Sequence, residues 1–259
     1  MLFTSLAFVF GLLIGSFLNV CIARLPKDES IVFPPSKCPA CQAPIKYYDN
    51  IPLLSYALLR GRCRACSQPI SPKYPAVEFA AGALTALFFA RWNWNLPWLL
   101  VSLASVYALI IVSVVDFETM MISDFFSVLL GALGLGGSLV NPFFDGAWPA
   151  RLAEAAGGAA AGAGLIWGLA LLGKVIYKKE AVGEGDVFLM AGIGALVGWE
   201  GVLTGLVMAS FLGSLYGVAL LIMKRADRLS HMPFGPFLAA GAVINLYSLV
   251  KLSDFLLEL

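Results

Sequence analysis

The sequence predicts an all-α polytopic membrane protein with about eight transmembrane helices and a small cysteine-rich cytoplasmic segment between the first two. Three observations predict this class. The 259 residues are 60% hydrophobic and 13% charged, with a mean hydropathy of +0.86, which leaves too little polar surface for a soluble domain. Apolar runs close to membrane-spanning length recur along the chain. Lys and Arg residues gather in alternate connecting segments.

The apolar runs define the expected helices, because a helix needs about 20 mainly apolar residues to cross a bilayer. One run, 186–198, is short, and it forms either a half-length or tilted helix or continues into the next run through Trp199 and Glu200. Seven or nine spans therefore also fit the pattern. The expected spans are 3–23, 76–91, 97–115, 124–140, 152–173, 186–198, 200–223 and 233–252.

The basic residues orient these spans. With eight spans, fourteen of the 17 Lys and Arg residues fall on one side of the membrane. Such a bias marks the cytoplasmic side, so both termini are expected to face outward. The net charge of +1 gives no indication of nucleic-acid binding. The segments assigned to the cytoplasm are 24–75, 116–123, 174–185 and 224–232.

The segment 24–75 is the one sizeable soluble piece, and it carries two C-x-x-C pairs separated by 21 residues. Four thiolates can close a tetrahedral shell around Zn²⁺. Paired disulfides are disfavoured on the reducing side of the membrane, and a redox C-x-x-C is disfavoured because there are two matched pairs. With no open coordination position, we expect a structural zinc that supplies folding energy to a small domain. The ligands are Cys38, Cys41, Cys63 and Cys66.

This segment divides the chain into three expected domains. A first transmembrane helix precedes it, and a larger transmembrane domain follows it. The boundaries are 1–23 for the first helix, 24–75 for the four-cysteine zinc-binding domain and 76–259 for the transmembrane domain.

Three aspartates lie at the cytoplasmic ends of the expected spans: Asp116, Asp124 and Asp186. A charged side chain in lipid costs about 2.5–3.5 kcal/mol or more, so these should face a bundle interior or a wet cleft. Helix capping is the alternative, and it suits Asp124 at a helix start. It does not suit Asp116, because a carboxylate at a helix C-terminus opposes the helix dipole. Asp186 follows Gly183 and Gly185, which allow another chain to approach closely.

Carboxylates of this kind indicate a hydrolase. Two of them in a partly desolvated site share a proton, so that one activates a water molecule while the other acts as an acid. His231 is the only histidine, and neither G-x-S-x-G nor H-E-x-x-H is present. The chain therefore lacks the sequence motifs of serine hydrolases and zinc proteases. A proton- or ion-coupled transporter is the main alternative, but it predicts mid-membrane carboxylates and repeated halves. A non-catalytic zinc-knuckle scaffold is the second alternative.

Five stretches, taken in order, make the chain resemble the type IV prepilin peptidases, which are polytopic aspartic proteases of the bacterial inner membrane. The resemblance implies that Asp116 and Asp186 are the catalytic pair. The stretches are GSFLNVCIARLP (15–26), CPAC (38–41) with NIPLLSYALLRGRCRACSQPISPKYPAVE (50–78), VDFETMMISD (115–124), EAVGEGDV (180–187) and FGPFLAAG (234–241).

The resemblance also implies a substrate and a second activity. These enzymes remove a short basic leader from prepilins, or from pseudopilins of type II secretion, on the cytoplasmic side of the membrane. Many then methylate the new N-terminus with S-adenosylmethionine, and members with two C-x-x-C pairs are typically bifunctional. No glycine-rich nucleotide loop after a strand is visible, so the residues that bind the methyl donor stay unassigned.

The residues around the expected pair include two departures from the family pattern. Ile122 and Ser123 stand where the family often has Leu-Pro, and Phe188 stands where it often has Lys. We expect Gly183, Gly185, Asp124 and Glu184 to support the active site. Our hypothesis for Glu184 is that it contacts the basic residues of the leader, and the alternative is an ordinary solvated loop residue.

Overall fold

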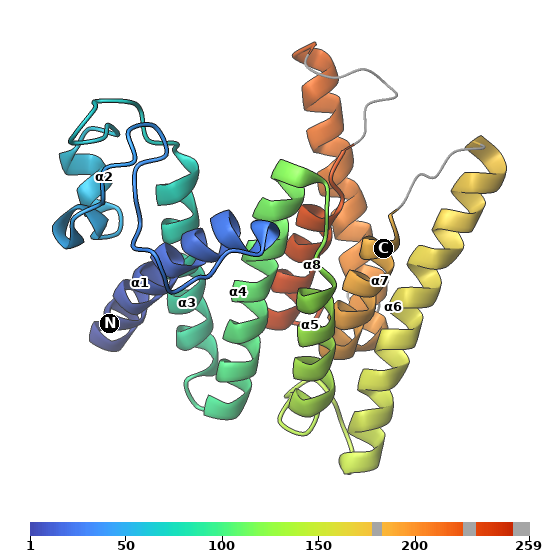
Figure 1. Cartoon of the computed structure of the whole chain (residues 1–259). Helices are drawn as coiled ribbons and strands as arrows, with labels where there is room; N and C mark the ends of the chain where they lie inside the picture. The colour runs from blue at the N-terminus through green and yellow to red at the C-terminus, as the bar shows by residue number, and fades with distance from the viewer. Residues whose placement is uncertain (178–182, 225–231, 251–259) are drawn as a thin grey trace. The chain divides into compact units, whose positions relative to one another are not determined.

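A computed structural model describes residues 1–177, 183–224 and 232–250, and these residues form helices and loops without a β-strand (Figure 1). This confirms the prediction of an all-α protein. The chain divides into two compact units, Met1–Trp94 and Asn95–Leu259. Several residues used above to orient the chain or exclude other enzymes lie outside the described residues: Lys178, Lys179, Arg225, Arg228, His231 and Lys251.

The N-terminal unit is a pair of antiparallel helices joined by a long loop. Its helices meet through small residues, since a Cβ atom added to Gly15 would lie 2.6 Å from the Cα atom of Glu78. Glycine at such positions lets two helix backbones approach closely, as membrane helix pairs require. The elements are α1 (Leu2–Arg24), η1 (Leu25–Lys27), η2 (Tyr47–Asn50), α2 (Leu54–Leu58) and α3 (Lys73–Trp92).

The C-terminal unit is built around helix α7, which packs against α5, α6 and α8. Small residues again mediate these contacts, because a Cβ atom added to Gly134, Gly158 or Gly241 would overlap backbone atoms of α7. The elements are α4 (Leu96–Thr119), α5 (Asp124–Gly137), α6 (Trp148–Tyr177), α7 (Glu184–Ile222) and α8 (Gly235–Tyr247).

Helix α7 reverses direction at Gly198, so its two arms run antiparallel (Figure 1). Gly198 has φ 71° and ψ 178°, a backbone region that is open almost only to glycine. The contacts require the reversal, because the start of the first arm and Tyr216 of the second arm both lie beside the C-terminal end of α4. The expected runs 186–198 and 200–223 are therefore two arms joined at a single glycine.

Four of the described helices are long and apolar enough to cross a membrane by length and composition. Helices α5 and α8 are shorter and apolar, and α3 is not among the four. The structure thus supports a membrane protein without reproducing the expected eight spans. The four helices are α1 (with the η1 turn), α4, α6 and α7.

Candidate functional site

Asp116 lies near the C-terminal end of α4, and only 4% of its surface is exposed. Its Oδ2 atom accepts a hydrogen bond of 3.0 Å from the backbone N–H of Gly235. Gly235 is the first residue of α8, and the first N–H groups of a helix have no partner within the helix. The structure therefore places the start of α8 against a buried carboxylate that would otherwise lack a donor.

Asp186 lies in the first turn of α7, where it is partly exposed. Its Oδ2 atom accepts a hydrogen bond of 3.2 Å from the N–H of Gly183, so it does cap its own helix. It also lies close enough to Asp116 for the two charges to interact. The structure thus brings together the two aspartates that the sequence singled out, across 70 residues of chain.

Ile122 packs between Gly185, which precedes Asp186, and Gly235, which binds Asp116. A Cβ atom added to Gly185 would lie 3.0 Å from the Cβ atom of Ile122, and one added to Gly235 would lie 3.3 Å from its Cδ1 atom. One of the two departures from the family pattern therefore has a packing role. The glycines at 185 and 235 are needed because side chains there would meet Ile122 or Asp116.

Two of the expected supporting residues, Asp124 and Glu184, and the departure at Phe188 lie on the surface. Asp124 is exposed as the first residue of α5, and Ser123 occupies the N-cap position without a side-chain capping bond. Glu184 is exposed at the start of α7. Phe188 is 57% exposed, so its ring is free of the packing that would fix a buried residue. None of these three side chains is buried with the pair.

An aromatic cluster beside the pair was not found from the sequence. The ring centroids of Phe117 and Tyr216 are 6.0 Å apart, those of Phe117 and Phe237 are 6.2 Å apart, and those of Tyr216 and Phe237 are 5.6 Å apart. The cluster joins α4, the second arm of α7 and α8 next to Asp116. The stretch FGPF was a signal for it, because it contains both Gly235 and Phe237.

The four predicted zinc ligands converge in the loop of the N-terminal unit. The Sγ atoms of Cys38, Cys41, Cys63 and Cys66 all lie within 4.8 Å of one another. Tetrahedral zinc with Zn–S bonds of about 2.3 Å holds its sulfur atoms about 3.8 Å apart, and the Sγ atoms of Cys38 and Cys66 are 3.9 Å apart. The residues present therefore fit a tetrahedral metal ion with four cysteine ligands.

The two cysteine pairs have the same local backbone structure. In each, the first cysteine accepts a 2.9 Å hydrogen bond from the residue four positions later, and that residue has a left-handed φ near 60°. The backbone N–H groups of Cys41 and Ala40 lower the pKa of the Cys38 thiol to about 7, whereas burial and the neighbouring cysteine side chains raise the pKa of Cys66 to about 11. Binding of a metal requires the cysteines as thiolates. The matching residues at the left-handed positions are Gln42 and Ser67.

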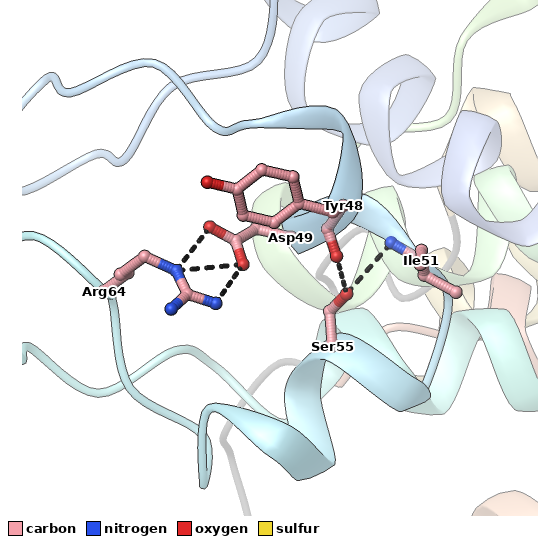
Figure 2. Close-up of polar contacts among 5 residues, drawn as sticks. All are labelled: Tyr48, Asp49, Ile51, Ser55 and Arg64. Atoms are coloured by element: carbon pink, nitrogen blue, oxygen red, sulfur yellow. Dashed lines mark hydrogen bonds and ion pairs between the residues drawn. The ribbon is translucent and has the colours of Figure 1, made fainter.

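A polar network attaches the second cysteine pair to the η2 turn (Figure 2). Arg64, which lies between Cys63 and Cys66, forms an ion pair with Asp49 at 2.6 Å. The Arg64 guanidinium holds the pKa of the Asp49 carboxyl below its usual range. Ser55 donates a hydrogen bond of 2.9 Å to the carbonyl oxygen of Tyr48. The network orients the loop that carries Cys63 and Cys66, and its charged groups are not among the four cysteines.

These features define a class of protein: a helical membrane protein with an aspartate pair at the ends of its helices and a four-cysteine cluster in a separate unit. Comparison with known proteins identifies the family. Residues 103–218 match the model of the type IV leader peptidase family, and residues 9–92 match the bacterial peptidase A24 N-terminal domain. The chain belongs to the type IV leader peptidase family.

Characterised relatives match almost the whole chain. A prepilin leader peptidase/N-methyltransferase of Aeromonas hydrophila is 36% identical over 272 residues, covering 95% of this chain and 90% of that protein. A protein of the same name from Pseudomonas putida is 36% identical, covering 93% of this chain and 89% of its own length. One from Klebsiella pneumoniae is 39% identical, covering 81% and 91%. No solved structure matches the chain.

Proposed function

We propose that this protein is a membrane aspartic endopeptidase that removes the basic leader from type IV prepilins or type II secretion pseudopilins and then methylates the new N-terminus. The observation that carries the proposal is the meeting of Asp116 and Asp186 in a chain related along its length to prepilin leader peptidase/N-methyltransferases. Family membership gives no support to the transporter alternative.

The proposed cleavage uses both aspartates as one unit. Two close carboxylates in a partly desolvated site share one proton. One takes a proton from a water molecule as the water attacks the scissile carbonyl, and the other gives its proton to the carbonyl oxygen and later to the leaving amine. The N–H groups of Gly235 and Gly183 hold the two side chains in place. The acid and base roles belong to the pair and are not divided between its members.

The four-cysteine site is proposed to hold a structural Zn²⁺. Its support is the fit of the four sulfur atoms and the repeated backbone turns. Zinc with four thiolate ligands has no open position for substrate or water. Its expected contribution is therefore folding energy for the loop.

S-adenosylmethionine is the proposed methyl donor. One described cavity, with a volume of about 400 Å³, lies between α6 and the second arm of α7. Its lining is apolar and offers nothing to the donor's charged groups, so the cavity does not fit this molecule. We assign no residue to the donor. The residues that line the cavity are Ala161, Gly164, Leu165, Trp199, Val202 and Leu203.

The proposed setting is the bacterial inner membrane, with about eight spans, both termini on the periplasmic side and the aspartate pair at the cytoplasmic face. Its support is the distribution of Lys and Arg in the sequence, following the positive-inside rule. The start of α7 lies close to the end of α4, because Asp186 and Asp116 interact, and this topology requires that proximity. The partners are then a prepilin or pseudopilin and the lipid bilayer.

The test is cleavage of a prepilin by the full-length enzyme in detergent, read as product mass. Asp116→Asn and Asp186→Asn should each lower cleavage by at least about a thousandfold, because the pair acts as a unit. Asp145→Asn, which removes an exposed carboxylate from the loop between α5 and α6, is the matched control and should cleave normally. Processing at the wild-type rate by either active-site variant would reject the mechanism, and a wild-type enzyme that never cleaves prepilin would reject the function.

A further inference from the structure

A second polar cluster lies in the N-terminal unit, where α1 and α3 pack together. It consists of Ser16, Asn19 and Glu78, and we call it the α1–α3 polar cluster. Gly15 and Glu78 are in close backbone contact, and the Ser16 hydroxyl lies within hydrogen-bonding range of the Glu78 carboxylate. Asn19 lies three residues after Ser16, so both occupy the same face of α1 about one turn apart.

The hydrogen bonds of this cluster leave one buried acceptor atom, Asn19 Oδ1, without a donor among the described residues. The Glu78 Oε2 atom accepts a hydrogen bond of 2.9 Å from the N–H of Leu53. The Asn19 Nδ2 atom donates a hydrogen bond of 3.0 Å to the carbonyl oxygen of Tyr74. Asn19 is only 6% exposed, and its Oδ1 atom has no hydrogen-bond partner among the described residues. Glu78 forms no ion pair within the same described part of the chain.

This arrangement indicates a ligand that carries donors and positive charge. A buried carbonyl oxygen without a donor is rare in folded proteins, and a half-buried carboxylate without a cation is costly. The structural bond of Asn19 to Tyr74 uses only its Nδ2 group, and that of Glu78 to Leu53 uses only one carboxylate oxygen, so neither bond supplies a donor to the Asn19 Oδ1 atom. An ammonium group has three N–H donors, and it would satisfy the Asn19 oxygen and the Glu78 carboxylate together.

We propose that the α1–α3 polar cluster binds the α-amino group that leader cleavage creates on the substrate, and that Glu78 takes the proton which this amine loses. The inference rests on the proposed function, which releases such an amine at the start of an apolar helix. Glu78 is six residues into α3, at the end of the helix pair that joins the four-cysteine loop. A half-buried carboxylate at that end suits a charged group followed by an apolar chain.

The substrate ammonium gives one proton to Glu78, which leaves a lone pair on nitrogen, and Asn19 orients the nitrogen through a second N–H. The sulfonium donor supplies a methyl group, so that an N–C bond forms as an S–C bond breaks and its electron pair stays on sulfur. The proton on Glu78 passes to solvent. A base is needed because an α-amine, with a pKa of about 7.7–8.0, is mostly protonated at neutral pH, and a protonated amine has no lone pair to accept the methyl group.

The experiment uses the full-length enzyme with two forms of one peptide that begins at the mature pilin N-terminus, either with a free α-amine or Nα-acetylated. Binding is read by fluorescence anisotropy without any methyl donor. The wild type should prefer the free amine by about tenfold or more, since a hydrogen bond to a charged group is being lost in the acetylated form. Glu78→Gln keeps an acceptor for the Leu53 N–H but should reduce this preference to about twofold or less. Asn19→Ala should reduce it as well.

The same variants are then assayed for both proposed activities. Glu78→Gln should lower methyl transfer from labelled S-adenosylmethionine by about a hundredfold or more, as loss of a general base does, with the donor's KM unchanged and leader cleavage far less affected. Thr85→Val, which removes a buried hydroxyl from the same helix pair outside the cluster, is the control. Normal methylation by Glu78→Gln would overturn the inference alone. A raised donor KM would overturn it by assigning the cluster to the donor.

Two results from the wild-type enzyme alone also test the inference. Equal binding of the free and acetylated peptides by the wild type would overturn the inference without any variant, so the test does not depend on the folding of Glu78→Gln. If the wild type cleaves prepilin and never methylates it, the methyl-transfer half of the proposed function fails and this inference fails with it. The endopeptidase proposal would stand in that case.

Discussion

The backbone N–H of Gly235 donates a 3.0 Å hydrogen bond to the Oδ2 atom of Asp116, although the two residues are 119 positions apart. The bond joins the end of α4 to the first turn of α8. Because the first N–H groups of a helix have no partner within the helix, the start of α8 offers a donor to this carboxylate. Helix α8 therefore contributes to the site through its backbone and not through a side chain.

Substituting Gly235 tests this contribution. A Cβ atom at residue 235 would lie 2.7 Å from the Asp116 Oδ2 atom and 3.3 Å from Ile122, so Gly235→Ala should push the carboxylate away from its donor. We expect prepilin cleavage to fall by about tenfold to a hundredfold, since a displacement of about 1 Å has effects of this order. Gly131→Ala, whose nearest contact is 4.0 Å away, is the control. Equal cleavage by the two variants would show that the α8 contact is dispensable.

Glu184 should influence which leader is cleaved. It is exposed in the first turn of α7, two residues before Asp186, and a surface ion pair contributes about 0.2–1 kcal/mol. Glu184→Gln should therefore reduce kcat/KM about twofold to fivefold for a prepilin with a basic leader. The matched substrate has Gln in place of each leader Lys and Arg, and its cleavage should not change. An equal loss on both substrates, or no loss on either, contradicts the proposed contact.

The helices could be predicted because each apolar run ends at polar or glycine residues. The expected span 97–115 became α4 from Leu96 to Thr119, and the expected start at 124 is the start of α5. The pairing of Asp116 with Asp186 followed from family resemblance, and the structure brings the two close enough to interact. The four-cysteine cluster followed from spacing alone, because two C-x-x-C pairs suit one tetrahedral ion.

The remaining features depend on contacts between distant parts of the chain. The hydrogen bond from Gly235, the aromatic contact of Phe117 with Tyr216, and the position of Ile122 join segments that no local pattern relates. Helix capping was the alternative role for Asp124, but the helix begins at Asp124 itself and Ser123 occupies the N-cap position. The expected spans 186–198 and 200–223 already required a reversal between them, but the left-handed turn at Gly198 could not be predicted, because one glycine among many gives no sign of its φ angle.

The metal site can be tested by zinc analysis. Because four sulfur atoms lie together, the purified protein should contain about one zinc per chain. Cys63→Ser should lose most of it, and the loop between α1 and α3 should become sensitive to protease, since structural zinc supplies folding energy. The control is Cys21→Ala, which changes the fifth cysteine, buried in α1 and outside the cluster. Zinc-free wild-type protein with a protease-resistant loop would contradict a structural role.

The reversal at Gly198 predicts a position-specific loss of stability. Alanine at this φ of 71° is strained, and its Cβ atom would lie 2.9 Å from Glu154 and 3.1 Å from Phe144. Strain of this kind costs about 1–3 kcal/mol, so Gly198→Ala should lower the free energy of unfolding by that amount in a thermal or denaturant titration. Gly157→Ala, in the neighbouring helix α6, has nothing within 4 Å of its added Cβ atom, and it should be neutral or slightly stabilising because alanine favours helix.

The same substitution should also affect cleavage. The first arm of α7 carries Asp186 back toward Asp116 only because the chain reverses at Gly198. Gly198→Ala should therefore reduce prepilin cleavage even at temperatures where most of the protein remains folded, whereas Gly157→Ala should not. A Gly198→Ala variant that melts and cleaves like Gly157→Ala would mean that the left-handed turn is not needed to bring the aspartates together.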